Sequence, residues 1–288
     1  MNILVTNDDG ILSEGILALA NVLKTKHNVI IIAPDGNRSG YSRSMSFHKD
    51  LTFLPHNLVE GVKAFTLSGT PSDCVRFGLT GLGLTFDLVI AGINHGSNLG
   101  NDIFYSGTVN SCYEANFCGV PAIAISNIAH NNFKFSETAS FIKEHIDNFI
   151  SYASKEYTLN INIPNVDKCD IKGIKVCKPG VCRYSDGYIK TSDTTFRLIG
   201  EPLPPTEDEF ETDVYYLYNN YVSVTPVVHC SLDNDIYENL KDAEVYNLTQ
   251  GQSIFLKPNL YHQMIINKDE TSFVYNGSEQ APTASVTT

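Results

Sequence analysis

The chain has 288 residues, enough for one large domain or for one domain with an appendage. Hydrophobic residues make up 42% and charged residues 18%, which excludes a wholly disordered chain and allows a sizeable core. The formal net charge is −12, and an acidic surface repels a polyphosphate backbone, which argues against a dedicated nucleic-acid binder. The charge of any phosphate group that the protein binds must therefore be compensated locally, by a metal ion or by backbone amides.

Targeting and redox patterns favour a cytoplasmic protein. The sequence has no run of about 18 apolar residues, so we expect no membrane-spanning helix. The N-terminus lacks the basic start and the apolar stretch of a signal peptide. The seven cysteines are odd in number and none forms a C-x-x-C pair, so we expect reduced thiols.

The first half of the chain alternates strand and helix patterns. A short apolar run at 3–6 ends in a polar turn, and Ser13 can then cap a helix with one apolar stripe through residue 23. Residues 29–33 are β-branched and apolar, as in a strand buried on both faces. This β-α-β start predicts a parallel sheet with right-handed crossovers.

The next helix has a strong start signal. Thr70 is the expected N-cap, Pro71 takes the first helical position, and Asp73 can complete a capping box. Further along, the patterns predict a strand at 87–91, a polar Gly-rich stretch at 92–107, a helix from about 108 to 119, a strand at 121–126, a helix at 136–155 and a strand at 159–163.

Beyond Pro164 the pattern changes to short β-like runs at 173–178, 214–218 and 221–228, separated by loops. The stretch 201–211, with three prolines and four glutamates, predicts a loop or a protruding arm. We therefore expect an α/β fold with a Rossmann-like, doubly wound, mostly parallel sheet and a smaller β-rich C-terminal extension. The expected divisions are a catalytic core at 1–164, a β-rich extension with an oligomerisation arm at 165–267, and a mobile tail at 268–288.

Polar segments follow several of the predicted strands. They are the turn 7–10, the loop 35–40, the stretch 92–100 and the segment 105–108. Ligands of doubly wound sheets bind outside the carboxyl ends of the strands. If the topology is right, all four segments lie at that one edge and form a single site.

The first turn holds two adjacent carboxylates, Asp8 and Asp9, which repel each other. A divalent cation relieves such repulsion, and Ser39 and Asn94 add a hydroxyl and an amide oxygen. These hard oxygen ligands suit Mg²⁺, Mn²⁺ or Ca²⁺. The alternative is structural: the two carboxylates cap the first helix or form an Asx-turn.

The segment before the helix at 108 predicts an anion site. Ser106, Gly107 and Thr108 lie at a helix N-terminus, where free amides and the helix dipole favour phosphate. Asp102 lies between the Asn-rich turn and this segment. It is a better candidate than His95 for general acid–base catalysis or for orienting water. Asn7, in the first polar turn, is a further candidate for substrate binding.

Five stretches resemble the SurE (survival protein E) family: ILVTNDDG at 3–10, APDGNRSGYSRSMSF at 33–47, SGTPSDCV at 68–75, IAGINHGSNLGNDIFYSGTV at 90–109 and, more weakly, YVSVTP at 221–226. The resemblance implies a Rossmann-like core with a swapped C-terminal arm, homodimers or homotetramers, and one divalent cation per subunit. It also implies hydrolysis of nucleoside 5′-monophosphates, and in some members of 3′-monophosphates and short polyphosphate.

By position, the resemblance carries the metal ligands to Asp8, Asp9, Ser39 and Asn94, the phosphate pocket to Gly40, Asn98, Ser106, Gly107 and Thr108, and a catalytic acidic residue to Asp102. Two departures stand out. Ser97 replaces a common proline, and His229 lies one residue later than the family's histidine. No membrane or nucleic-acid partner is expected.

Three other classes of protein are alternatives. A receiver-like signalling or binding module holds Mg²⁺ on an acidic pair but needs a phospho-accepting Asp after a central strand. A nicotinamide-dependent oxidoreductase needs G-x-G-x-x-G between a strand and a helix, whereas Gly92, Gly96 and Gly100 are four residues apart. A dehalogenase-type phosphatase needs two aspartates separated by one residue, and Asp8 and Asp9 are adjacent. The sequence therefore favours a metal-dependent phosphomonoesterase.

Overall fold

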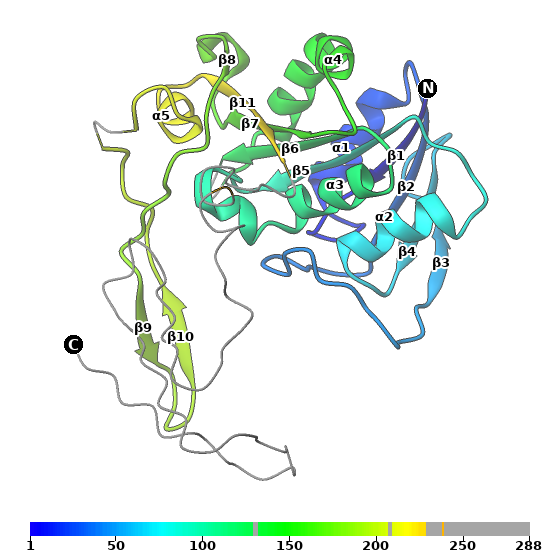
Figure 1. Ribbon diagram of the computed structural model, residues 1–288, viewed down its shortest axis with the longest axis horizontal. Coiled ribbons are helices and arrows are strands. Elements are labelled where there is room, and N and C mark those ends of the chain that lie inside the picture. Colours follow the sequence, from blue (N-terminus) through cyan, green and yellow to red (C-terminus); the bar gives the residue numbers. More distant parts are fainter. Residues whose placement is uncertain (129–131, 207–208, 229–237, 239–288) are drawn as a thin grey trace. The chain divides into compact units, whose positions relative to one another are not determined.

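The computed structural model describes residues 1–128, 132–206, 209–228 and 238 (Figure 1). The stretch Met1–Cys230 forms one compact unit. His229, Cys230 and the expected tail at 268–288 lie outside the described residues.

The described chain forms two sheets flanked by helices (Figure 1). The strands are β1 (Asn2–Thr6), β2 (Asn28–Pro34), β3 (Phe53–His56), β4 (Lys63–Leu67), β5 (Leu88–His95), β6 (Ala122–Ile128), β7 (Thr158–Pro164), β8 (Ile174–Val176), β9 (Gly187–Lys190), β10 (Phe196–Ile199) and β11 (Val222–Val227). The helices are α1 (Glu14–Leu23), α2 (Pro71–Thr80), α3 (Gly107–Phe117), α4 (Phe135–Ser151) and α5 (Asp213–Tyr218), with short 3₁₀ turns η1 (Gly100–Phe104) and η2 (Lys168–Asp170).

The large sheet has the strand order β3-β4-β2-β1-β5-β6-β7-β11-β8. All neighbours from β4 to β7 are parallel, β3 and β11 run antiparallel to β4 and β7, and β8 runs parallel to β11. After β1 the chain moves outward to β2 and β4, and it later returns to β1's other side with β5. The carboxyl ends of β1 and β5 therefore flank the switch point, where such folds bind ligands. The predicted doubly wound α/β fold is confirmed.

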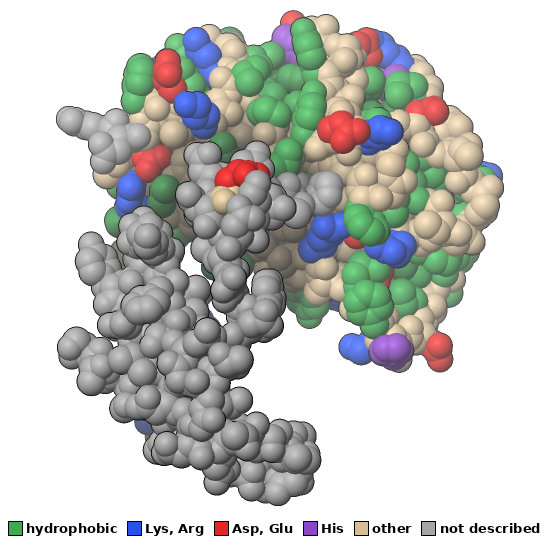
Figure 2. Space-filling model, viewed as in Figure 1, with side chains coloured by type: hydrophobic (Ala, Val, Ile, Leu, Met, Phe, Trp, Pro, Cys, Tyr) green, Lys and Arg blue, Asp and Glu red, His purple; other side chains and the backbone are tan. Residues whose placement is uncertain are grey.

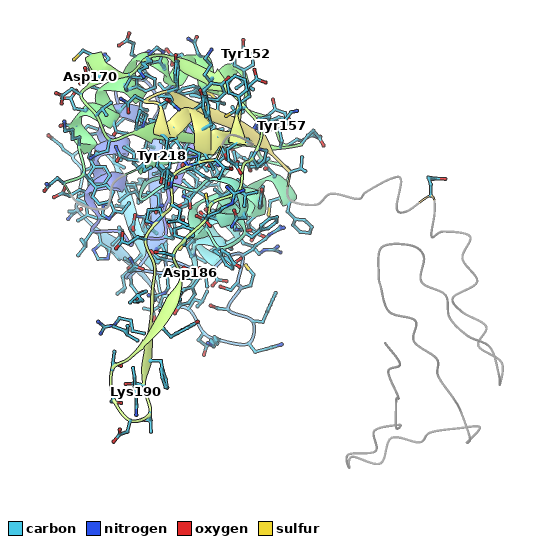
Figure 3. All side chains as sticks on the ribbon, turned by 90° about the vertical axis from the view of Figure 1, so that its left-hand side faces the viewer. Tyr152, Tyr157, Asp170, Asp186, Lys190 and Tyr218 are labelled. Carbon is cyan, nitrogen blue, oxygen red and sulfur yellow. The ribbon has the colours of Figure 1, made fainter. Side chains whose placement is uncertain are left out.

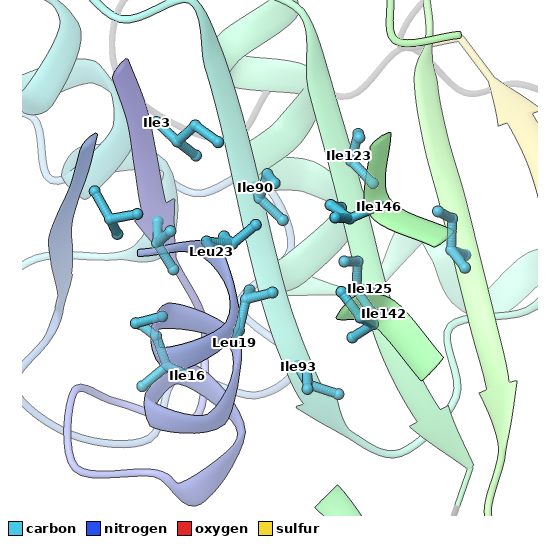
Figure 4. Close-up of a cluster of buried hydrophobic side chains, with 14 of the residues drawn as sticks. Ile3, Ile16, Leu19, Leu23, Ile90, Ile93, Ile123, Ile125, Ile142 and Ile146 are labelled. Carbon is cyan, nitrogen blue, oxygen red and sulfur yellow. The ribbon is translucent and has the colours of Figure 1, made fainter. Parts of the chain in front are cut away.

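Apolar side chains fill both faces of this sheet. On one face, the stripe of α1 packs with α4 against β1, β5 and β6 (Figure 4), through residues such as Leu19, Ile90 and Ile142. On the other face, α2 and α3 cover Leu4 and Ile32 with Val75 and Cys112. Burial on both faces explains why β1, β2 and β5 are continuous apolar runs.

Three local expectations differ from the structure. Residues 214–218 form the helix α5 rather than a strand, because Thr212 accepts a hydrogen bond from the Tyr215 amide as an N-cap, and Val214 and Leu217 pack together on Leu99. This contact overrides the β preference of valine and tyrosine. The strand β5 continues four residues beyond 91, and the hairpin-forming β3 and β4 were not predicted.

The protruding arm is a two-stranded hairpin of β9 and β10, which precedes the Pro-rich stretch. Figure 3 shows Asp186 at its root and Lys190 near its tip, away from the sheet. Every residue of β10 is exposed. The root is closed by a β-bridge between Tyr184 and Pro202. The stretch 201–206 thus returns the chain from the arm to the body.

The described surface carries charges of both signs. On the face in Figure 2, acidic and basic side chains are interspersed, with no broad basic patch among the described residues. The six cysteines of the described chain are all free. None of the helices in the ranges that the structure describes is long and apolar enough to cross a membrane.

Replacing Thr70 tests the capping box of α2. Its hydroxyl accepts from the Asp73 amide at 3.1 Å and donates to the Ser44 carbonyl at 2.7 Å, while the Asp73 carboxylate accepts from the Thr70 amide. We expect Thr70→Ala to lower the free energy of unfolding by about 1–2 kcal/mol in urea titrations. Thr80→Ala, at the exposed end of the same helix, is the control and should change it by less than about 0.5 kcal/mol. Equal losses in both variants would contradict the capping role.

Candidate active site at the switch point

The turn after β1 is built by Asn7. Its side-chain amide donates to the Gly10 carbonyl at 2.9 Å and to the Ser13 hydroxyl at 2.7 Å, and its Oδ1 accepts from the Gly10 amide. Asn7 is fully buried and does not line the pocket described below. Its polar atoms are hydrogen-bonded within the turn, so Asn7 shapes the turn that holds Asp8, and the expected substrate contact stays a prediction.

The end of β5 positions Asn94. The register between β5 and β6 shifts between Ala91 and Asn94. Gly92 lies in this irregularity with φ +133°, and a Cβ there would be 2.2 Å from the Ile125 carbonyl oxygen. Only glycine fits such a conformation and approach. The Asn94 amide nitrogen then donates to the Gly96 carbonyl at 2.9 Å, which leaves its Oδ1 without a donor among the described residues.

The loop after β2 is hydrogen-bonded to the turn after β1. The Arg38 amide donates to the Asp8 carbonyl at 2.6 Å. The Asn37 side chain accepts from the Ser39 amide at 2.8 Å, and the Arg38 guanidinium pairs with Asp35. The Ser39 hydroxyl makes no hydrogen bond within the described chain. Ser39 is therefore held beside Asp8 by backbone contacts while its side chain stays available.

These segments meet around one pocket of about 210 Å³. Its lining includes the expected metal ligands Asp8, Ser39 and Asn94, the expected phosphate contacts Gly40, Asn98 and Ser106, and Asp102. Residues from four separated segments thus share one cavity at the carboxyl edge of the sheet. Gly107 and Thr108 do not line it but lie against Asp8.

Asp8 is buried against the start of α3. The Thr108 hydroxyl donates to its Oδ1 at 2.5 Å. A Cβ on Gly107 would be 2.6 Å from the Asp8 Cβ, so only glycine permits this approach. Burial raises the pKa of Asp8 to about 6; the Thr108 hydroxyl and the Gly107 amide lower it, and the charge of Asp9 raises it. The ionised carboxylate is therefore costly without a compensating positive charge.

Asp9 lies beside His95 rather than on the pocket wall. Its Oδ2 accepts from the His95 amide at 3.1 Å, and its Oδ1 is 3.6 Å from the His95 Nδ1. Burial raises the pKa of Asp9, and the nearby His95 lowers it. His95 itself lines the pocket, so the Asp9 carboxylate adjoins the pocket without lining it.

Asn98 is held by a buried polar network that the sequence analysis missed. Its amide donates to Asn162 Oδ1 at 2.7 Å, and its side chain donates to the Ser126 hydroxyl at 2.8 Å. Its carbonyl accepts from the side chains of Asn160 and Asn162. The only sequence signal was the alternation of asparagines in the otherwise apolar run 158–164, because polar residues are rare in a central strand.

Asp102 is tied to the root of the arm. It lies in η1, and its carboxylate accepts a hydrogen bond from the Tyr184 hydroxyl. Next to it, the Asn101 side chain accepts from the Cys182 amide at 2.6 Å. Asp213 accepts from the amides of Gly100 and Gly180 and so joins the same two segments. The arm root therefore fixes the position of the acidic candidate.

The donor set of the pocket fits a hard divalent cation. The described residues contain no group of three or more His, Cys, Asp or Glu side chains that could hold a metal ion. A cation here must therefore use neutral oxygens besides the carboxylates, and the free oxygens of Ser39 and Asn94 are of that kind. Carboxylate, amide and hydroxyl oxygens suit Mg²⁺ or Mn²⁺. A receiver module would need an aspartate at the end of β5, where Asn94 stands.

The sheet and the pocket at its switch point define an α/β protein of the doubly wound class with a candidate phosphate-handling site. A family model described as "Survival protein SurE" matches residues 3–186 of this chain. The chain belongs to the SurE family.

Relatives of known name cover most of the chain. It is 40% identical over 236 residues to a protein of Clostridium beijerinckii named 5′-nucleotidase SurE, covering 79% of this chain and 92% of the relative. It is 37% identical over 248 residues to the protein of that name from Kosmotoga olearia, covering 84% and 98%. The crystal structure of the SurE protein from Aquifex aeolicus superposes with a TM-score of 0.73 at 34% identity, over 84% of this chain and 98% of that one.

The raised pKa of Asp8 predicts a pH-dependent cost in metal-free protein. An aspartate with an ordinary pKa of 3.8 when unfolded and about 6 when folded destabilises the fold as pH rises from about 4 to above 6. At about 1.4 kcal/mol per pKa unit, the cost above pH 6 is on the order of 3 kcal/mol. With chelator present, we expect Asp8→Asn to raise the free energy of unfolding at pH 8 and to lose this advantage near pH 4.

Asp50→Asn serves as the control, because the Asp50 side chain is exposed and makes no hydrogen bond or ion pair in the described chain. Its stability should follow that of the wild type at both pH values. If Asp8→Asn were no more stable than the wild type at pH 8, Asp8 would not carry the buried charge that the geometry indicates.

Proposed function

We propose that this protein is a divalent-metal-dependent phosphomonoesterase that hydrolyses nucleoside 5′-monophosphates. The observation that carries the proposal is the one pocket lined by Asp8, Ser39 and Asn94, in which Asp8 packs against the start of α3. The names of the relatives in C. beijerinckii and K. olearia support the substrate class. The proposal extends, as in some family members, to 3′-monophosphates and short polyphosphate.

Asp8, Asp9, Ser39 and Asn94 would hold the cation, which would be Mg²⁺, Mn²⁺ or Ca²⁺. When bound, the cation supplies a positive charge to a phosphoryl oxygen and lowers the pKa of water. Asp9 would bind the cation from its position beside His95, whereas Asp8, Ser39 and Asn94 line the pocket.

The chain's own residues orient the phosphate. The Asn98 side chain, Ser106 and the backbone at Gly40 line the pocket, and the start of α3 adds its dipole. Donors fixed in advance stabilise charge that develops on the equatorial oxygens without reorganising. The network around Asn98 keeps this donor in place. Gly107 and Thr108 contribute by holding Asp8.

Asp102 is the proposed group that takes a proton from the attacking water. It lines the same pocket as Asp8, and its carboxylate accepts a hydrogen bond from the Tyr184 hydroxyl. A fixed carboxylate within the pocket suits general-base work. We favour direct attack by water over a phospho-aspartate intermediate, with Asp8 as the alternative base.

Loss of activity on removal of one carboxylate tests the function. We expect Asp9→Asn to lower kcat/KM for AMP by about 100-fold or more, because a cation would lose a charged ligand. Chelator should abolish the wild-type activity, and added Mg²⁺ or Mn²⁺ should restore it. The exposed Asp50→Asn variant is the matched control and should keep full activity. Full activity of Asp9→Asn, or activity unaffected by chelator, would count against the proposal. Labelling by acetyl phosphate would instead favour the receiver-like module.

We further propose that the protein forms homodimers or homotetramers through the arm. The hairpin exposes Tyr188, Phe196 and Leu198, which are 72%, 62% and 57% exposed. Large apolar side chains on a projecting two-stranded hairpin favour burial against another copy.

Replacing two arm residues tests the assembly. We expect Phe196→Ser combined with Leu198→Ser to lower the molar mass measured by light scattering, because the apolar contact is removed. A pair of exposed residues elsewhere, Leu12→Ser with Leu54→Ser, should leave the mass unchanged. A monomeric wild-type protein would contradict the assembly.

A further inference from the structure

His95 connects the pocket at the switch point to the buried carboxylate of Asp9. The His95 side chain is 34% exposed and lines the pocket, whereas the Asp9 side chain is only 5% exposed. The His95 amide donates to Asp9 Oδ2 at 3.1 Å, and the ring Nδ1 lies 3.6 Å from Asp9 Oδ1. Both oxygens of Asp9 therefore face the same residue, one through the backbone and the other through the ring.

Two phenylalanine rings hold the imidazole in place. The His95 ring centroid lies 4.8 Å from those of Phe133 and Phe135, and the two phenylalanine rings stack at 5.3 Å. Aromatic rings at such distances attract each other. Phe135 is buried at the start of α4, and a Cβ on Gly15 of α1 would be 3.3 Å from its ring, so α1 packs closely on it. The imidazole is therefore anchored to the core of the protein.

The polarity of this ring suits a carboxylate. An ionised carboxylate only accepts hydrogen bonds, so the favoured tautomer of a neutral His95 carries its proton on Nδ1, which faces Asp9 Oδ1. At 3.6 Å the contact is longer than a hydrogen bond, and it orients the carboxylate by electrostatic attraction. A carboxylate that is oriented in advance loses less conformational freedom when it binds a cation.

We propose that His95 is a positioning residue for the cation site: its anchored ring orients Asp9 as a ligand and thereby strengthens the binding of the divalent cation. The inference rests on the proposed function, because it takes Asp9 as a ligand of the cation. In this role His95 contacts neither the cation nor the substrate and acts through Asp9. Replacing a group that orients a metal ligand typically lowers metal affinity by about 10–100-fold.

Binding of Mn²⁺ alone tests this role. In His95→Phe the new ring can still pack on Phe133 and Phe135, and the amide contact to Asp9 is kept, but Nδ1 is lost. We expect the dissociation constant for Mn²⁺ to rise about 10-fold or more. It is measured without substrate, by EPR spectroscopy of the free ion.

His145→Phe is the matched control. The His145 ring also packs on two phenylalanines, with centroid distances of 4.4 Å to Phe141 and 6.4 Å to Phe149. It lies on α4 and does not line the pocket. His145→Phe should therefore bind Mn²⁺ as the wild type does.

The Mn²⁺ dependence of catalysis distinguishes positioning from a direct or merely structural role. In His95→Phe we expect half-maximal activity toward AMP to need about 10-fold more Mn²⁺ or a higher excess, while kcat at saturating Mn²⁺ approaches that of the wild type. A kcat that stays low at saturating Mn²⁺ would overturn the positioning role. A directly coordinated imidazole nitrogen in the pulsed EPR spectrum of the wild type with Mn²⁺ would overturn it too, because His95 would then be a ligand itself.

The same measurements separate this inference from the proposed hydrolase. Mn²⁺ affinity that His95→Phe leaves unchanged or raises would overturn the positioning role even if the wild type hydrolyses AMP. A wild type that binds Mn²⁺ in the His95-dependent way but hydrolyses no phosphate ester would refute the hydrolase and retain the positioning role. A wild type that binds no Mn²⁺ would overturn both.

Discussion

The burial of two adjacent carboxylates at the end of β1 is the constraint on which the site depends. Burial raises the pKa values of both Asp8 and Asp9. The protein offsets part of that cost with a hydroxyl from Thr108 and an amide from His95. These contacts compensate only part of the negative charge, so an excess of it remains at the pocket. A cation bound here, as we propose, would balance that charge and would let a phosphate approach a protein whose net charge otherwise repels it.

The rest of the fold holds this pair in place and brings donors to it. Glycine at 107 lets α3 approach Asp8, and glycine at 92 permits the irregularity that turns Asn94 toward the pocket. The polar network around Asn98 adds rigidity where the sheet would otherwise be apolar. The arm root reaches back to η1 through the bond from Tyr184 to Asp102. The segments after residue 164 therefore support the site through Tyr184. Their strands β8 and β11 also belong to the large sheet.

Local patterns succeeded where the interactions that they predict are themselves local. The capping box at Thr70 and Asp73 involves residues three apart, so the sequence contains both partners. The prediction for 214–218 was wrong because an N-cap and packing on Leu99, more than a hundred residues away, outweigh the β preference of that run. Asn7 was expected to bind substrate, and that stays a prediction. The structure adds that its side chain closes the turn, which the sequence did not reveal because proximity in sequence does not tell which way a side chain points.

The sequence by itself determined the alternation of strands and helices in the first half, the polar segments at the strand ends and the family. The alternation follows from hydrophobic periodicity, and parallel strands of this kind place their carboxyl ends at one edge. Only the tertiary structure decided which polar residues share the pocket, how Asn160 and Asn162 support Asn98, and how the arm root holds Asp102. Those relations join residues about 60 to 100 positions apart, and their geometry depends on packing, which no local pattern records.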